Sequence, residues 1–216
     1  MRALIRYVWS DALRGHGWIA PLLCFFVIEA IICAQTGLVL PTYAVSAVAL
    51  LFISTWLTVV TVNSEDPIQL SITVTSAGSQ SRVRLAKLLV AFLAGGALGL
   101  VGLVGPLIAT SFDATIADVV AGAGAQILTT LTGVALGALL SRPVVTKRSW
   151  SVVLGFGVCL ATVVVPYGPP ARQLLVLFNK TAADALGPAI LLIALETVVI
   201  ALVAVGTSLR LARWRS

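Results

Sequence analysis

Charged residues are scarce in this chain. Of its 216 residues only 10% are Asp, Glu, Lys or Arg, whereas 59% are hydrophobic. A soluble domain carries roughly 25% charged residues, so an ordinary soluble domain is excluded. The mean hydropathy of +1.08 agrees with the charge deficit. Together these values indicate a membrane protein.

Side chains that bind metals or form disulfides are also few. The single histidine is His16, and Cys24, Cys33 and Cys159 fall within apolar runs without CxxC spacing. The three cysteines are therefore predicted to pack as small apolar side chains. The chain also lacks a GxxxxGK[ST] nucleotide loop, an HExxH motif and a GxSxG motif. We expect no catalytic residue, no metal and no cofactor on this chain, and hence no enzyme.

Long apolar runs dominate what is present. A bilayer core of about 30 Å requires roughly 20 apolar residues per helix. The runs are continuous rather than alternating, which favours helices over a β-barrel. They cover residues 18–35, 43–62, 88–111, 119–140, 151–165 and 188–209. We therefore expect an all-α integral membrane protein, a single domain of six transmembrane helices in which 151–165 is the shortest.

Basic residues gather in every second interval between the apolar runs. Those intervals hold Arg2, Arg6, Arg14, Arg82, Arg84, Lys87, Arg142, Lys147, Arg148, Arg210, Arg213 and Arg215, whereas the other loops hold only Arg172 and Lys180. This is the positive-inside pattern, so both termini are predicted to be cytoplasmic. Abundant Ala, Val and Gly with little Lys favours a high-GC bacterial genome, and we expect the chain in the bacterial cytoplasmic membrane. The net charge of +6 then points to membrane lipids, not to nucleic acid.

Residues 2–16 have the pattern of an amphipathic interfacial helix. One face carries Arg2, Arg6, Ser10 and Arg14, and the other carries Leu4, Ile5, Val8, Trp9 and Leu13. A basic helix that contains Trp typically lies in the membrane interface. The alternative is a straight cytoplasmic extension of the first span. Gly15 and Gly17, which flank His16, favour a bend and hence the interfacial helix.

The longest polar interval, residues 63–87, is predicted to be a cytoplasmic loop with a short helix. Asp66 suits a helix N-cap and Pro67 the first helical position, and Gly78 is a natural terminator. Between them Ile68, Leu70 and Ile72 alternate with polar residues, a pattern closer to a strand. Because an isolated strand at a membrane surface would have no partner, we expect a helix over 66–77.

A second unusual interval, residues 166–187, precedes the last apolar run. Pro166, Pro169 and Pro170 forbid a continuous helix, and the apolar stretch 173–178 is too short to cross a bilayer. We expect short helices that dip into the outer leaflet, with Asn179 and Lys180 turning back, in a re-entrant-like outer loop.

Glycines recur at spacings of three and four residues in two runs. They are Gly95, Gly99, Gly102 and Gly105 in the third run, and Gly133 and Gly137 in the fourth. This spacing keeps them on one helix face and predicts close packing against a neighbouring helix.

Two carboxylates, Glu29 and Glu196, lie inside apolar runs. At 1.5 Å per residue both fall near the middle of the bilayer. Ionisable residues there face the protein interior or a water-filled cavity. They are therefore candidates for a substrate path that attracts cationic groups. The alternative is a protonated carboxyl group that is hydrogen-bonded to a neighbouring helix.

Taken together, the six spans, the basic N-terminal helix and the two unusual loops resemble a permease subunit of the type-2 ABC exporter class. The residues that carry this resemblance are Ser64-Glu65-Asp66-Pro67, then Ser81-Arg82 and Lys87. It implies that the loop is a coupling helix docked on a separate ATPase subunit, which would bind the ATP. The implied coupling residues are Glu65, Asp66, Pro67, Ile68, Leu70 and Ile72. It further implies a second permease copy or paralogue as partner.

Two other protein classes fit the same pattern. One is the substrate-binding membrane subunit of a vitamin importer, which also has six spans. Against it stands the long polar loop 63–87. The other is a non-transporting membrane scaffold or immunity protein. Co-purification of an ATPase would distinguish the exporter permease and the vitamin importer from the scaffold or immunity protein.

Overall fold

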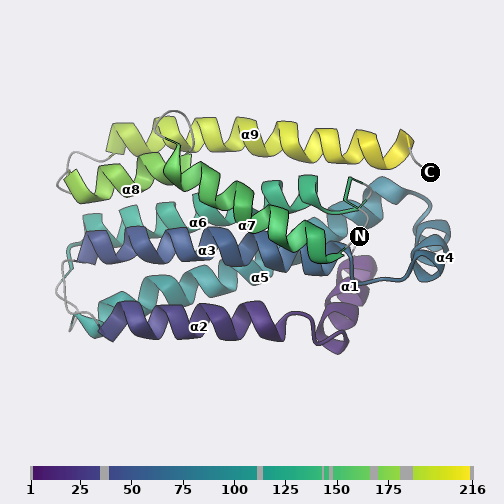
Figure 1. Ribbon diagram of the computed structural model, residues 1–216, viewed down its shortest axis with the longest axis horizontal. Helices are drawn as coiled ribbons and strands as arrows, with labels where there is room; N and C mark the ends of the chain where they lie inside the picture. Colours follow the sequence, from purple (N-terminus) through teal and green to yellow (C-terminus); the bar gives the residue numbers. More distant parts are fainter. Residues whose placement is uncertain are drawn as a thin grey trace.

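The computed structural model of the chain is a bundle of helices lying along one axis (Figure 1). It describes residues 2–34, 39–110, 114–142, 144–145, 148–165, 170–180 and 187–214, and every regular element in them is a helix. The helices are α1 Arg2–Arg14, α2 Ile19–Ala34, α3 Val39–Val62, α4 Pro67–Ala77, α5 Gln80–Ala109, α6 Ile116–Leu140, α7 Arg148–Val164, α8 Pro170–Lys180 and α9 Gly187–Trp214. The prediction of an all-α protein is confirmed.

Four helices are long and apolar enough to cross a membrane on their own. They are Val39–Val62, Gln80–Ala109, Ile116–Leu140 and the Ala189–Leu211 part of α9. Helices α1 and α2 pass the same test together, as a pair bent by 77°, which raises the number to five. The predicted spans 18–35 and 151–165 correspond to α2 with 16 residues and α7 with 17, short of the roughly 20 needed.

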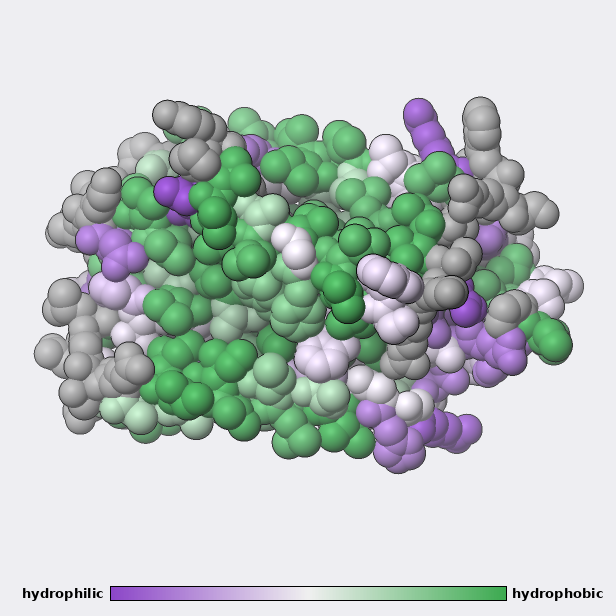
Figure 2. All heavy atoms as spheres, in the orientation of Figure 1, coloured by the Kyte–Doolittle hydropathy of each residue, from purple (hydrophilic) through white to green (hydrophobic). Residues whose placement is uncertain are grey.

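Many large apolar side chains face outward from the bundle, and several polar ones are buried between its helices. On the surface of α9, Leu191, Leu192 and Leu202 are about 70% exposed (72, 70 and 69%), while Ser54 and Thr58 on α3 are fully buried. Hydrophobic residues cover most of the middle of the face in Figure 2, and hydrophilic ones gather mainly toward the end with α1 and α4. This arrangement fits a protein embedded in a membrane.

Helix α3 is the centre of the bundle and packs most closely against α6. A Cβ added at Gly137 would lie 2.5 Å from Thr58 Cβ and 2.8 Å from the Thr55 carbonyl oxygen, and one at Gly133 would lie 2.9 Å from the Leu51 carbonyl. The predicted packing role of these glycines is confirmed. The buried hydroxyls nearby donate to carbonyls four residues earlier, as Thr58 does to Ser54 at 2.7 Å, so no polar group is stranded there.

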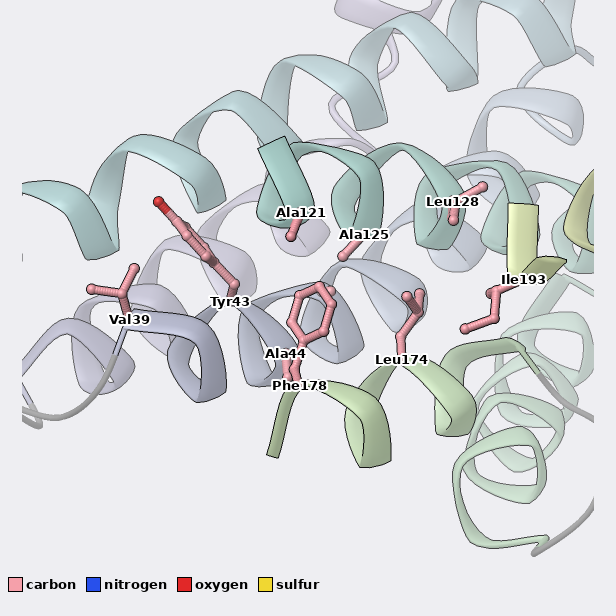
Figure 3. Packing of buried hydrophobic residues seen from close by; sticks show 10 residues of the cluster. Val39, Tyr43, Ala44, Ala121, Ala125, Leu128, Leu174, Phe178 and Ile193 are labelled. Atoms are coloured by element: carbon pink, nitrogen blue, oxygen red, sulfur yellow. The ribbon is translucent and has the colours of Figure 1, made fainter. Parts of the chain in front are cut away.

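The end of α3 that begins at Val39 lies in an apolar cluster that also receives α8. Leu174 and Phe178 project from α8 into this cluster, with Phe178 near Ala44 of α3 (Figure 3). Leu174 and Phe178 are each only 2% exposed. Helix α8 is therefore part of the bundle core.

Helices α7 and α8 follow one another along α3, in the direction opposite to that of α3. Cys159 of α7 lies 3.3 Å from Thr55, and Ala171, near the start of α8, packs with Cys159 and Leu51 at the middle of α3. The helix in the predicted outer loop is present, but it begins at mid-bundle and continues the course of α7 to Lys180 (Figure 1). Residues 166–169 and 181–186 of that loop lie outside the described residues.

Arg172 explains how α7 can end inside the bundle. Its guanidinium donates to the carbonyl oxygens of Val163, at 3.3 Å, and of Val164, the last residues of α7. Carbonyls at a helix C-terminus have no partner within the helix, and a cation there also meets the negative end of the helix dipole. The break between Val165 and Pro170 is thus stabilised from the α8 side.

The predicted bend between α1 and α2 is confirmed at 77°. His16 has a positive φ of 51° at the turn, and Trp18 Nε1 donates to the Leu13 carbonyl at 3.0 Å, near the end of α1. Helix α1 consequently crosses the end of the bundle. Both chain termini, α1 and α4 lie at this end, which we call the basic end because Arg82, Arg84 and Arg142 also lie there (Figure 1).

Candidate functional site at the basic end of the bundle

Helix α4 is the short helix expected in the central loop. Asp66 precedes it with extended backbone (φ −64°, ψ 149°), Pro67 opens it, and Gly78 ends it with φ 69° in the left-handed region. The predicted helix and its end at Gly78 are confirmed, despite the strand-like alternation of its apolar residues. The expected cap is not formed, because the Asp66 side chain makes no hydrogen bond to the helix N-terminus.

The apolar residues of α4 divide between two faces. Ile68 and Ile72, one turn apart, are 74% and 66% exposed. Leu70 instead faces the protein, where it lines a small pocket of about 120 Å³ together with Glu65, Arg84 and Lys87. In a helix, residues i and i+4 share a face and residue i+2 does not. All three residues were expected to contact the partner, but only Ile68 and Ile72 lie on the exposed face of α4.

Glu65 is buried and paired, not presented to a partner. Its carboxylate lies 3.0 Å from Lys87 Nζ, and the two side chains are 1% and 3% exposed. Lys87 Nζ also donates to the carbonyl of Val62, the last residue of α3, at 3.3 Å. The expectation that the Glu65 charge meets a partner surface is therefore corrected: this charge fixes the connection between α3, α4 and α5.

Arg84 ties the start of α5 to the ends of two other helices. Its Nη2 donates to the Ala138 carbonyl at 2.9 Å, its Nη1 to the Arg142 carbonyl at 2.6 Å, and its Nε to Ser208 Oγ of α9 at 3.3 Å. Ala138 lies in the last turn of α6, where carbonyls need an external donor. The Arg84 side chain thus caps the C-terminus of α6. In the sequence it is one of the positive charges that flank the predicted membrane spans.

Helix α1 rests beside α4 at the same end. Ser64 Oγ donates to Asp11 Oδ2 at 3.0 Å, and Gln69 Nε2 of α4 donates to the Tyr7 hydroxyl at 3.1 Å. A surface hollow of about 490 Å³ lies between the two helices and is bordered by Tyr7, Ile72 and Arg82. The two helices therefore form one continuous surface with exposed isoleucines, a hollow and basic residues at its edge.

The two carboxylates expected in the membrane interior have different surroundings. Glu29 is 4% exposed and accepts a hydrogen bond from Ser46 Oγ of α3 at 2.9 Å. Glu196 is half-buried and accepts one from Gln173 Nε2 of α8 at 3.0 Å. Helices α2 and α9, which carry them, lie on opposite sides of the bundle in Figure 1. The structure does not bring the two carboxylates together.

Several residues of these sites were missed in the sequence. Ser46, Gln126 and Gln173 have no distinctive spacing, because their partners come from other helices. Arg172 offered a signal: it is one of only two basic residues in the outer intervals of the sequence, and it follows two prolines.

Comparisons with known proteins add no relative: no family model, no curated protein and no solved structure matches this chain.

Proposed function

We propose that this chain is the permease subunit of an ATP-driven exporter of the type-2 ABC class in a bacterial cytoplasmic membrane. A separate subunit would bind and hydrolyse ATP, and α4 would be the coupling helix that docks on it. The observation that carries the proposal is the exposure of Ile68 and Ile72 on a short helix at the basic end. Exposed apolar residues at a polar end typically mark a protein contact.

The proposed topology has six passages through the membrane. They are α2, α3, α5, α6, the broken pair α7–α8, and α9. The position of both termini at the basic end supports an even number of passages (Figure 1). The basic residues of α1 and of the starts of α5 and α7 support a cytoplasmic location for this end.

Helix α4 is suited to transmit force because it is held at its start and along its first two turns. At its start the buried Glu65–Lys87 pair connects it to α5. Along its length Gln69 bonds to α1, and Thr73 Oγ1 lies 3.5 Å from Glu65 Oε1. A displacement of α4 by a docked subunit would therefore move α1 and α5 as well. This is the mechanical link that a permease without nucleotide chemistry requires.

Docking energy should be concentrated in the two exposed isoleucines. Truncation of a buried interface anchor costs on the order of 1–4 kcal/mol. Loss of both side chains would weaken the ATPase complex by roughly 30-fold or more, at about 1.4 kcal/mol per factor of ten. Asp66 is exposed and Glu65 is not, so Asp66→Lys is expected to weaken binding of the ATPase subunit in a salt-dependent way.

The test is co-purification in mild detergent of the tagged chain with an ATP-hydrolysing subunit from its native cells. The parent should retain such a subunit, and the variant Ile68→Ala with Ile72→Ala should lose it while remaining folded in the membrane. Ile116→Ala is the matched control, because Ile116 is 85% exposed at the start of α6, away from α4. If the double variant keeps the ATPase as the parent does, docking occurs elsewhere, on residues 142–150 or on α1.

The substrate path is proposed to run beside the break between α7 and α8. Broken helices at mid-membrane are common at transporter binding sites, where helix ends and polar side chains meet a substrate. Here Arg172 and Gln173 begin α8, and Gln173 reaches the half-buried Glu196. Glu29 is enclosed by three other helices and is a weaker candidate for contact with substrate.

A further inference from the structure

A closed polar cluster lies among α2, α3, α5 and α6, within the apolar bundle. Gln126 Nε2 donates to Ser46 Oγ at 3.1 Å, and Ser46 Oγ donates to Glu29 Oε2 at 2.9 Å. Glycines of α5 form the remaining wall: a Cβ at Gly102 would lie 2.5 Å from Ser46 Oγ, and one at Gly105 would lie 3.4 Å from Glu29 Oε1. The cluster is therefore tightly enclosed.

Two buried acceptor atoms of this cluster have no hydrogen-bond donor among the described residues. Glu29 and Gln126 are 4% and 3% exposed, yet Glu29 Oε1 and Gln126 Oε1 accept no hydrogen bond from the described residues. Both atoms are acceptors when the carboxyl group is ionised, so the cluster lacks a donor. Buried polar groups are nearly always paired, and a buried charge without a counter-ion is costly.

Among the described residues of the four helices that form the cluster, no cation lies beside this carboxyl group. The only charged residue of α2 is Glu29, α3 has none, and α6 has only Asp118, eight residues before Gln126. The basic residues of α5 are Arg82, Arg84 and Lys87, at its opposite end, and Lys87 pairs with Glu65. The titratable neighbours are Cys33, near Gly105, and Tyr43, whose hydroxyl donates to the Leu103 carbonyl at 3.2 Å.

We infer that Glu29 is a proton-binding site: it takes one proton from water onto Oε1 and is held as a neutral carboxylic acid inside the membrane. The bound proton turns Oε1 from an acceptor into a donor. The proposed acceptor is Gln126 Oε1, which has no donor among the described residues, so that one proton would pair both atoms. A metal ion is a poorer occupant, because the four oxygens of these three side chains, packed against two glycines, do not supply the six or so ligands that hard cations take. The inference requires that the chain is membrane-embedded and is independent of the proposed exporter function.

Infrared spectroscopy of the full chain in lipid bilayers tests this inference at pH 8, where exposed carboxyl groups are ionised. The parent should show the carbonyl stretching band of a protonated carboxylic acid, shifted in D₂O. Glu29→Gln, which has nearly the shape of the neutral acid, should lack the band. The matched control Glu196→Gln should keep it. Absence of the band in the parent overturns the inference even if no variant folds.

Two further measurements decide the details. Gln126→Leu should shift the frequency of the acid band, because it removes the acceptor, and an unchanged frequency would contradict the assignment of Gln126 Oε1. Replacement of choline by Na⁺ at constant ionic strength should leave the band unchanged. Its disappearance in Na⁺ would assign the site to a metal cation instead.

Discussion

The buried ion pair between Glu65 and Lys87 predicts a large asymmetry between single and double substitutions. At 3.0 Å and an effective dielectric constant of about 20, two unit charges attract by about 5 kcal/mol. Removing one partner leaves the other charged and buried, which typically costs about 3–5 kcal/mol. Lys87→Met should therefore destabilise the protein by about that amount, and Glu65→Leu should have a similar effect.

The double variant Glu65→Leu with Lys87→Met should recover most of this loss. Two apolar side chains fill the space without desolvated charges, and such replacements are often neutral or stabilising. Some loss remains, because Lys87 also donates to the Val62 carbonyl at the end of α3. One such hydrogen bond contributes roughly 1 kcal/mol.

Unfolding in detergent, followed by circular dichroism with the four proteins of a double-mutant cycle, measures these free energies. Arg82→Met is the control, because Arg82 lies on the same helix and is exposed. It should change stability by less than about 0.5 kcal/mol. The expected asymmetry is contradicted if Lys87→Met lowers the free energy of unfolding no more than Arg82→Met does. The Glu65–Lys87 pair would then be hydrated and would contribute no more than a surface ion pair.

Three further outcomes are expected. Gly137→Ala should destabilise the protein by about 1–3 kcal/mol, because the added Cβ would contact the α3 backbone. In the control Gly96→Ala the added Cβ has no atom within 4 Å, so this variant should unfold at the parental temperature. In a background without native cysteines, an impermeant thiol reagent on intact cells should label a cysteine at Lys180 but not one at Ser79; the opposite pattern would contradict the proposed topology. Glu196→Gln should reduce export of a cationic substrate more than that of a neutral one while assembly is intact, and equal rates would remove Glu196 from the path.

The sequence predicts this fold well where the signal lies within one helix. Apolar runs, glycine spacing and the Gly15–His16–Gly17 bend each depend on neighbours in the chain, and each is found in the structure. Helix α5 begins at Gln80, eight residues before the predicted span, because Arg84 and Lys87 satisfy their charges against other helices. The sequence does not show these pairings between helices. In the sequence, Arg84 and Lys87 indicate only the end of a membrane span.

The same limit applies to the candidate sites. Asp66-Pro67 and Gly78 correctly bracket α4, but the burial of Glu65 depends on Lys87, which lies 22 residues later. The position of Glu29 inside an apolar run is evident from the sequence, whereas its neighbours Ser46 and Gln126 come from two other helices. Pairings between distant helices are set by packing, and a single sequence does not record them.

The joint between α7 and α8 has a mechanical consequence. A continuous helix along this course would act as a single rod, so a tilt imposed at one membrane face would reappear at the other. Helix α7 ends at Val164, α8 begins at Pro170, and the Arg172 side chain connects the two helices. Each half can then follow its own neighbours: α7 the half of α3 near the basic end, and α8 the cluster around Tyr43 and Ile193.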